Sequence, residues 1–505
     1  MRLSRGTPPE GTIRDWVDAR AEAGGMGLSF PDEGTALDWP SLRNRARAMA
    51  ALLTARGIAK GESVAILHSN GQAAIEAIYG TLYGGFRATM INLVAGAEAI
   101  GYALDHSGAR VALVHPTQES VFKSVNPDGR IAMVNMTETA PEAVLHPVTP
   151  DDHALLMYTS GTTGRPKGVV HTQASLLAGG WTTTIAHDLT PEDTGLCVLP
   201  VYHINGLCVS VMGSLVSGGQ LAMCARFSAS RFWQQAAETQ ATWFSVVPTI
   251  VSHLLHGETG PDPETRRRLR FGRSASSPLP VEVHTAFEAR FDVPIVETMG
   301  LTETAAQILS NPLPPGTRKI GSPGVAFGNL AEVAGPDMRP LPPGEEGEII
   351  VKGPNVMLEY LRNPEATRDS FTPDGWLRTG DLGRKDAEGY FFVTGRLKEL
   401  IIKGGENIAP REIDEVLYAH PDVVEAAAFS CPCSRYGERV EAAVALRPGS
   451  TLTPEILLTL CKDRLGAFKS PDHIHFLDEL PKGPSGKIQR VRLNSLLAGD
   501  LERNS

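Results

Sequence analysis

The sequence predicts an α/β protein. We expect a large N-terminal domain of layered α/β subdomains plus a small barrel-like β piece, followed by a smaller α+β C-terminal domain. Three observations lead to this fold class. Helix-period and strand-period segments alternate in the first part of the chain. A proline- and glycine-rich stretch with short apolar runs follows from Gly316 to Gly353. The last hundred residues carry strand and helix signals of their own.

The first alternating stretch runs from Leu42 to His115. It opens with "RARAMAALLTARGI", which has the period of an amphipathic helix and ends at Gly57. The strand "GESVAILH", the helix "AAIEAIYGTLYGG" and the strand "RVALVH" come next. Strands that alternate with helices in this way indicate parallel sheets covered by helices.

The same pattern returns further along the chain. "DTGLCVLP" and "ATWFSVVP" are predicted strands that end in proline, and "VEVHTAFEARF" is a predicted helix before "DVPIVET". Short runs such as "GEIIVKG" then indicate the antiparallel, barrel-like piece.

The segment after Gly395 indicates a new domain. In "RLKELIIKGGENIAPREIDEVLYAH" a strand meets a Gly-Gly turn, and Pro410 opens a helix with Ile413, Val416 and Leu417 on one face. We therefore expect domains at residues 1–395 and 396–505.

Composition excludes several classes of protein. The chain has 505 residues, a net charge of −10 and a pI near 5.8, which argues against a nucleic-acid binder. The longest run without charged residues, Thr194 to Ala225, contains too many polar residues to predict a membrane span. Neither end resembles a targeting signal, and the six cysteines have no zinc-ligand spacing. We expect reduced thiols and a cytoplasmic location.

The stretch "YTSGTTGRPKG", Tyr158 to Gly168, has an unusual composition. Backbone amides of a glycine-rich turn bind anions, and here serine and threonine hydroxyls and a lysine are added. The spacing differs from that of a P-loop. By itself the stretch predicts either a phosphate-binding loop or a surface turn.

Seven further segments occur between Pro200 and Lys487: "PVYHING", "SASSPL", "MGLTE", "GEIIVKGPNVMLEYLRNPEAT", "WLRTGD", "GRLKELIIKGGENIAPREID" and "PKGPSGK". In this order, and with the loop, the chain resembles the acyl-adenylate-forming superfamily, which contains acyl-CoA synthetases, luciferases and peptide-synthetase adenylation domains. The resemblance implies an acid–CoA ligase that uses ATP, Mg²⁺ and coenzyme A. Such a ligase would convert the acid to acyl-AMP with release of pyrophosphate, and a thiol would then displace AMP.

The resemblance also implies the nucleotide-binding residues. They are Thr159, Ser160, Gly161, Thr162, Thr163, Gly164, Lys167, Ser276, Ser277, Pro278, Met299, Gly300, Asp381 and Arg396. The family usually has tyrosine at the position of Met299. An aromatic ring stacks better on adenine than a methionine side chain does. Met299 therefore either weakens ATP binding or replaces the ring as a polarisable contact.

Four residues are the implied catalytic set. His203 would lie beside the carboxylate, Thr302 would contact the α-phosphate, and Glu303 would be the metal ligand for Mg²⁺. Lys487 would reach the carboxylate and the α-phosphate in the first step. In isolation, a histidine is more often a core residue and the lysine is an exposed one, so their roles rest on the resemblance.

The family turns its small domain between the two steps, so the C-terminal domain is expected to be mobile. The implied hinge is Lys398. Gly404 and Gly405 would form the coenzyme A tunnel, since glycine lets pantetheine pass close to the backbone.

Similarity to hydroxycinnamate–CoA ligases implies the acyl pocket. Its residues are His203, Asn205, Val209, Trp243, Arg273, Ala306 and Gln307. The polar and cationic members would remain unpaired around a fatty chain, at roughly 1–3 kcal/mol each. We therefore expect a short acid with a second polar or anionic group, such as a sulfo-acid or a dicarboxylic acid. In the alternative, Arg273 turns away and pairs with a nearby carboxylate.

Other functions are also open at this point. The enzyme is either a CoA ligase or a stand-alone enzyme that loads a carrier protein, and an aryl or medium-chain acid is an alternative substrate. An ATP hydrolase with a borrowed loop would release phosphate instead of pyrophosphate. A non-catalytic relic should have lost Lys487, Glu303 or Asp381, and all three are present. A homodimer is possible.

Overall fold

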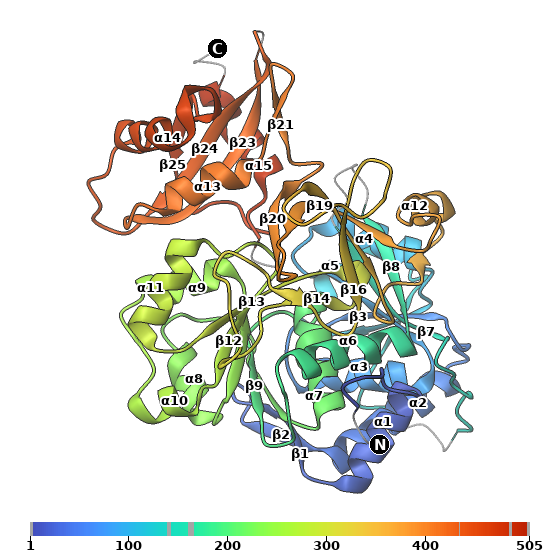
Figure 1. Ribbon diagram of the computed structural model, residues 1–505. Helices are drawn as coiled ribbons and strands as arrows, with labels where there is room; N and C mark the ends of the chain where they lie inside the picture. The colour runs from blue at the N-terminus through green and yellow to red at the C-terminus, as the bar shows by residue number, and fades with distance from the viewer. Residues whose placement is uncertain (1–3, 139–142, 160–165, 434, 484–486, 502–505) are drawn as a thin grey trace.

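The computed structural model of the chain describes residues 4–138, 143–159, 166–433, 435–483 and 487–501. A large N-terminal domain carries a smaller C-terminal domain, drawn in orange and red in Figure 1. The large domain contains two extended sheets and a smaller antiparallel sheet, and the small domain is built on one further sheet.

The seven-stranded sheet has the order β18-β8-β7-β4-β3-β5-β6. Its strands are β3 (Ser63–Leu67), β4 (Arg87–Met90), β5 (Val111–Val114), β6 (Ala132–Val134), β7 (His153–Thr159), β8 (Lys167–Thr172) and β18 (Glu359–Tyr360). The strands β3 to β7 run parallel, as the alternating pattern predicts, and β8 returns antiparallel to β7.

The nine-stranded sheet has the order β15-β14-β13-β12-β11-β9-β10-β1-β2. Its strands are β1 (Met26–Phe30), β2 (Thr35–Asp38), β9 (Thr194–Cys197), β10 (Gln220–Met223), β11 (Trp243–Val246), β12 (Phe271–Ser274), β13 (Ile295–Leu301), β14 (Ala306–Ser310) and β15 (Val325–Ala326). Its central strands β9 to β13 are parallel, so their carboxyl ends meet at one edge.

Helices fill the space between and around these sheets. They are α1 (Ile13–Ala23), α2 (Trp39–Ala55), α3 (Gln72–Gly84), α4 (Ala97–Ser107), α5 (Glu119–Val125), α6 (Gln173–Ala186), α7 (Gly213–Ser217), α8 (Phe232–Glu238), α9 (Pro248–His256), α10 (Pro263–Arg268), α11 (Val281–Phe291) and α12 (Pro364–Asp369). Two short 3-10 turns, η1 (Pro116–Gln118) and η3 (Thr302–Thr304), and the π-helix η2 (Asn205–Met212) complete the set.

The main hydrophobic core explains why α3 and α6 are apolar on nearly all sides. It joins side chains of both large sheets, such as Val64 and Leu221, to Ile78 of α3 and Leu177 of α6. These helices therefore lie between the sheets, where each buried aliphatic side chain stabilises the fold by roughly 1.5–3 kcal/mol.

The start of α2 differs from the predicted one. The helix begins at Trp39, before the predicted segment, because the Asp38 side chain accepts a hydrogen bond from the Ser41 backbone N–H at 2.7 Å. A proline in the first turn adds to this start. The predicted end holds, since Gly57 follows the last turn with a φ of 73°.

The antiparallel piece is a four-stranded sheet with the order β16-β17-β19-β20. Its strands are β16 (Leu330–Ala334), β17 (Glu346–Lys352), β19 (Leu377–Lys385) and β20 (Phe391–Arg396). The strands β16 and β17 lie within the predicted stretch, and the sheet extends beyond it through β19 and β20.

The small domain contains β21 (Ile401–Lys403), β22 (Glu406–Ile408), β23 (Val423–Cys433), β24 (Gly437–Leu446) and β25 (His473–Phe476), with α13 (Pro410–Tyr418), α14 (Pro454–Lys469) and α15 (Arg490–Leu501). Its core includes Ile413 and Leu417 of the predicted helix α13. The predicted hinge Lys398 lies in the segment 397–400, between β20 and β21. None of the described helices combines the length and apolarity that crossing a bilayer requires.

Candidate active site

The predicted phosphate-binding loop connects the antiparallel strands β7 and β8. Thr159 at the end of β7 pairs with Lys167 at the start of β8. The predicted residues between them, Ser160, Gly161, Thr162, Thr163 and Gly164, lie outside the described residues. The Lys167 Nζ atom lies 4.6 Å from the centroid of the Tyr360 ring, which is a cation–π contact.

Tyr360 connects this lysine to the predicted metal ligand. Its hydroxyl donates a 2.7 Å hydrogen bond to Glu303 Oε1. Burial and the neighbouring Glu303 carboxylate raise the pKa of Tyr360, so the phenol keeps its proton as a donor. The sequence prediction missed Tyr360, which lies in the segment "GEIIVKGPNVMLEYLRNPEAT", where no site residue was predicted.

His171 forms a hydrogen bond with the backbone of the turn that carries Thr302 and Glu303. The His171 Nε2 atom lies 2.7 Å from the Thr302 carbonyl oxygen. Burial lowers the pKa of His171 to about 4, so a neutral imidazole donates this bond. Gly300 allows a close approach just before the turn, since a Cβ there would lie 1.4 Å from the Ala306 carbonyl oxygen.

The predicted adenine-binding residues follow the carboxyl ends of two adjacent parallel strands. Ser276, Ser277 and Pro278 come directly after β12, and Met299 and Gly300 lie in the last half of β13. Ser276 has a φ of 78°, in the left-handed region that non-glycine residues rarely adopt. Backbone strain of this kind is concentrated at ligand-binding sites.

The predicted ribose-binding residues form an ion pair. Asp381 and Arg396 face each other on β19 and β20, and Arg396 Nε donates to Asp381 Oδ1 at 2.7 Å. Burial raises the pKa of Asp381, and the positive charges of Arg396 and Lys487 oppose that rise. The charge of Lys487, on the small domain, therefore acts on the ribose-binding pair.

Glu399 holds the predicted catalytic lysine. The Lys487 Nζ atom lies 3.2 Å from Glu399 Oε1, and Arg490 Nε lies 3.5 Å from Glu399 Oε2. Although burial acts in the opposite direction, Lys487 and Arg490 lower the pKa of Glu399. The sequence analysis did not single out Glu399, although it is the residue after the predicted hinge.

Three predicted pocket residues meet around a buried guanidinium. Arg273 Nη1 donates to Asn205 Oδ1 at 2.9 Å and to Ser245 Oγ at 3.3 Å. Arg273 Nε lies 3.5 Å from Gln307 Oε1. Ser245 was not predicted. It is the only polar residue of the buried strand β11, and a polar residue in an apolar strand could have indicated a role in the pocket.

The alternative interpretation of Arg273 is wrong for the described part of the chain. Its side chain is 1% exposed, and none of the described carboxylates pairs with it. Because burial disfavours the charged form, the pKa of Arg273 falls to about 9. The site therefore contains a positive charge with neutral partners.

The other predicted pocket residues surround this group. Trp243 pairs with Phe271 two residues along the strands from the Ser245–Arg273 pair, and their rings stack at 5.7 Å. His203 lies two residues before the start of η2, which contains the buried Asn205 and Val209. Ala306 opens β14 next to Gln307, with a φ of 82°.

The predicted coenzyme A residues are not brought to this site. Gly404 and Gly405 form the exposed turn between β21 and β22, with φ values of 60° and 89°. The Gly404 N–H donates to the Tyr436 carbonyl within the small domain. In this arrangement the small domain turns Lys487, and not the glycine pair, toward the nucleotide residues.

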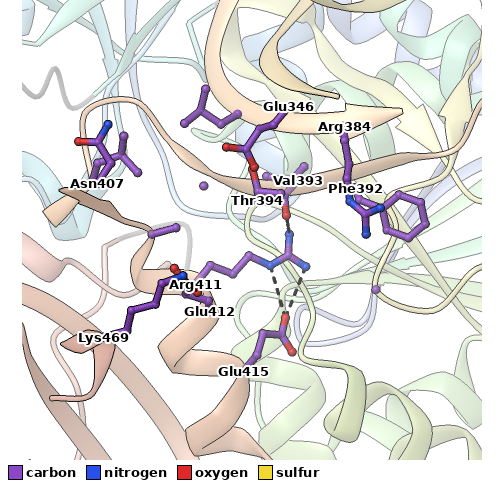
Figure 2. Close-up of a pocket in the computed structure, with 15 residues that line it drawn as sticks. Glu346, Arg384, Phe392, Val393, Thr394, Asn407, Arg411, Glu412, Glu415 and Lys469 are labelled. Atoms are coloured by element: carbon purple, nitrogen blue, oxygen red, sulfur yellow. Dashed lines mark hydrogen bonds and ion pairs between the residues drawn. The ribbon is translucent and has the colours of Figure 1, made fainter. Parts of the chain in front are cut away.

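A cavity of about 520 Å³ lies between the two domains. Figure 2 shows Arg411 and Glu415 of α13 facing each other across one side of it. Arg411 donates to the Val393 carbonyl of β20, and Glu415 Oε2 accepts from the Val281 N–H of α11 at 3.3 Å. None of the described lining residues belongs to the predicted site, so this cavity is a feature of domain docking.

The residues present fit the predicted metal. Within the described ranges, no cluster of three or more histidine, cysteine, aspartate or glutamate residues forms a complete metal cage. Mg²⁺ needs no such cage when a nucleotide is bound, because it uses one or two carboxylates, phosphate oxygens and water. Glu303, in the turn η3 between β13 and β14, suits this role.

Comparisons with known proteins agree with this geometry. The family described as "AMP-binding enzyme" matches residues 16–361, and "AMP-binding enzyme C-terminal domain" matches residues 412–487. The chain is 46% identical over 453 residues to sulfoacetate–CoA ligase of Cupriavidus necator, covering 87% of this chain and 88% of that protein. It is 36% identical over 467 residues to oxalate–CoA ligase of Arabidopsis thaliana, covering 88% and 90%.

A solved structure shares the whole fold. O-succinylbenzoate coenzyme A synthetase from Bacillus subtilis, in complex with ATP and magnesium ion, superimposes with a TM-score of 0.84 at 31% identity. The similarity covers 95% of this chain and 99% of that one. The chain therefore belongs to the AMP-binding enzyme family of the acyl-adenylate-forming superfamily, as an ATP-dependent acid–thiol ligase.

Proposed function

We propose that the protein joins coenzyme A to a short carboxylic acid that carries a second anionic group, namely a sulfo-acid or a dicarboxylic acid. The observation that carries this proposal is Arg273, a buried guanidinium whose described partners are neutral oxygens. A buried charge without a counter-ion is costly, and an anionic substrate group would supply that counter-ion. The names of the sulfoacetate and oxalate ligases support the same class of acid.

In the proposed first step, the carboxylate attacks the α-phosphate of ATP and pyrophosphate leaves. Negative charge builds up on the phosphate, so the protein needs cations and donors and no nucleophilic side chain. Lys487 would neutralise charge on the reacting carboxylate and α-phosphate, and Thr302 would donate to that phosphate. Asp381 would accept hydrogen bonds from the ribose hydroxyls.

Mg²⁺ held by Glu303 and the phosphates would neutralise charge on the departing pyrophosphate. Tyr360 orients the Glu303 carboxylate through their 2.7 Å hydrogen bond. His171 fixes the turn that carries both Thr302 and Glu303. The chain's own residues therefore support the metal ligand from two sides.

In the proposed second step, the small domain turns about Lys398, and Gly404 and Gly405 replace Lys487 at the site. The thiol of coenzyme A then attacks the acyl carbon and AMP leaves. The segment 397–400 between two separate sheets supports this hinge. The proposed domains are residues 1–395 and 396–505.

All six cysteines are unpaired thiols, which supports a reducing, cytoplasmic setting. A homodimer remains a prediction.

Acid-dependent exchange of labelled pyrophosphate into ATP tests the proposal. The panel contains sulfoacetate, oxalate, malonate and succinate beside acetate, octanoate and ferulate, with a coenzyme A thioester assay on each active acid. We expect the doubly anionic acids to give the fastest exchange. Release of ADP and orthophosphate, or a clear preference for octanoate or ferulate, would contradict the proposal.

The variant Arg273→Leu makes the test specific for the pocket. We expect kcat/KM for the preferred anionic acid to fall by about a hundredfold, since a lost charged hydrogen bond costs about 1.5–3 kcal/mol. Arg268→Leu is the matched control, because Arg268, at the end of α10, bonds to the backbone carbonyls of Ala236 and Ala241. Unchanged activity of Arg273→Leu on the anionic acids would rule out the cationic pocket.

A further inference from the structure

A second layer of buried polar groups lies behind Arg273. His187 follows the last residue of α6 and is fully buried, and its Nε2 atom lies 3.2 Å from Gln307 Oε1. The Gln307 Nε2 atom donates to the Thr182 carbonyl at 3.1 Å. The nitrogen of this amide therefore faces a carbonyl, and its oxygen faces both His187 and Arg273.

His187 holds this orientation as a neutral donor. Burial, together with the positive charges of Arg273 and Arg270, keeps the pKa of His187 well below its usual value. A neutral imidazole has a single N–H, and the amide oxygen of Gln307 can only accept. The proton must therefore sit on Nε2, and the buried Nδ1 has no hydrogen-bond partner among the described residues.

The result is a set of three oxygens around one guanidinium. Asn205 Oδ1, Ser245 Oγ and Gln307 Oε1 lie on the Nε and Nη1 side of Arg273. A flipped Gln307 amide would turn its N–H groups toward the guanidinium and away from an acceptor. In the described part of the chain no hydrogen-bond acceptor contacts Nη2, so a ligand that reaches Arg273 would meet this side of the guanidinium.

We infer that His187 is a positioning residue for the second anionic group of the substrate. By holding the Gln307 oxygen on Arg273, it fixes the guanidinium with neutral acceptors only, and the ligand must bring the negative charge. This inference rests on the proposed function. It predicts that the pocket selects for charge and not for shape, so a sulfonate is bound far better than a neutral sulfone of the same size.

The pair of probes is sulfoacetate and methylsulfonylacetate. They share the reacting carboxylate and the CH₂–SO₂ group, but only sulfoacetate carries a second charge. KM and kcat are measured by pyrophosphate exchange, and an acid that is not turned over is measured as a competitive inhibitor.

The first variant is His187→Phe, which removes the N–H but keeps a ring against Phe271, whose centroid lies 5.1 Å away. We expect KM for sulfoacetate to rise by about tenfold, with kcat changed less than about twofold and methylsulfonylacetate unaffected. His187→Gln restores a donor and should recover most of the loss. Unchanged KM for sulfoacetate, or an equal rise for both probes, would overturn the inference.

Two further variants complete the test. His146→Phe is the control for a general effect of losing a histidine, because His146 also meets a phenylalanine ring and a backbone carbonyl but lies outside the pocket. Gln307→Glu keeps the test open if His187→Phe does not fold, since it places a counter-ion beside Arg273. It should reverse the preference toward methylsulfonylacetate, and a retained preference for sulfoacetate would contradict the inference.

The two proposals fail in different ways. A wild-type enzyme that activates no doubly anionic acid contradicts the proposed function. A wild-type enzyme that activates sulfoacetate, with a His187→Phe variant of the same selectivity, contradicts only the role of His187.

Discussion

At the scale of single residues, the informative positions are polar groups in places that packing alone would make apolar. Arg273 and Ser245 lie on neighbouring buried strands, and Ser245 is visible in the sequence as a break in the apolar run "WFSVV". Their partners His187 and Gln307 come from distant segments, so their contacts required the fold. Residue type therefore indicated a polar pocket, while its hydrogen-bond pattern was not predictable.

Tyr360→Phe tests the support of the metal ligand. The hydroxyl donates to Glu303 Oε1, and the ring remains to contact Lys167 after the change. Loss of a hydrogen bond to a charged group costs about 1.5–3 kcal/mol, so we expect the exchange rate to fall by about tenfold or more. Titration with MgCl₂ should show a higher half-saturation concentration, and an unchanged Mg²⁺ dependence would argue against this role.

At the scale of elements, helix and strand types were predictable because the hydrophobic periods are clear. The helix α13 begins at the predicted Pro410 and buries the predicted face. The strand order of the two large sheets was not predictable, since β18 pairs with β8 and β1 pairs with β10, which lie far from them in sequence. The start of α2 was missed because the capping residue Asp38 lies outside the helical period.

Gly300→Ala tests the close approach of β13 and β14. A Cβ at this position would lie 1.4 Å from the Ala306 carbonyl oxygen, a clash with backbone that no side-chain rotation removes. We expect a loss of about 2–3 kcal/mol of stability, seen as a lower thermal midpoint. Gly344→Ala is a useful contrast, because a Cβ there meets no atom within 4 Å and only its positive φ opposes the change.

Acid should weaken the attachment of α11 to β13. Glu288 accepts hydrogen bonds from the Ile295 N–H and from Arg318. Although burial opposes the effect, its bonds to His284, Arg318 and Ile295 lower the pKa of Glu288 to about 2. A depressed carboxyl pKa stabilises the folded state above the unfolded value near 4.5, and this contribution is lost as pH falls toward 2.

The variant Glu288→Gln measures that contribution. At pH 7 we expect it to lower the free energy of unfolding by about 2–3 kcal/mol, from the size of the pKa shift. Denaturant midpoints of the two proteins should differ by a constant amount above about pH 5 and converge below it. A difference that is independent of pH down to 3 would show that the charge of Glu288 is not the cause.

At the scale of the whole molecule, the structure corresponds to the arrangement expected for the first half-reaction. Lys487 lies close to Asp381 and Arg396, while Gly404 and Gly405 are exposed on the small domain. The sequence implied both faces of the small domain by resemblance. Which face is docked depends on contacts between the domains that no local pattern encodes.

Lys487→Ala separates the two half-reactions. We expect acid-dependent pyrophosphate exchange to fall by more than about a thousandfold, because the variant lacks the cation for the developing charge. Conversion of supplied acyl-adenylate and coenzyme A to the thioester should remain within a few-fold of the wild type. Equal loss of both rates would contradict the assignment of Lys487 to the first step.

Contacts that dock the small domain should also affect the ratio of the two half-reaction rates. Glu415 joins α13 to the Val281 N–H of α11, and it also holds Arg411, which reaches the Val393 carbonyl across the cavity in Figure 2. A turn of the domain would break these bonds, so they stabilise only the docked arrangement. Glu415→Ala should therefore slow acyl-adenylate formation by about fivefold, equivalent to about 1 kcal/mol, and leave thioester formation unchanged or faster.

Lys469→Met is the control for this last prediction. Lys469 lines the same cavity, but its ion pair with Glu412 lies within the small domain, at 2.6 Å, and does not depend on docking. It should leave the ratio of the two half-reaction rates at the wild-type value. If Glu415→Ala and Lys469→Met change that ratio equally, the effect belongs to the cavity's charge in general, and the Glu415–Val281 contact does not select the docked state.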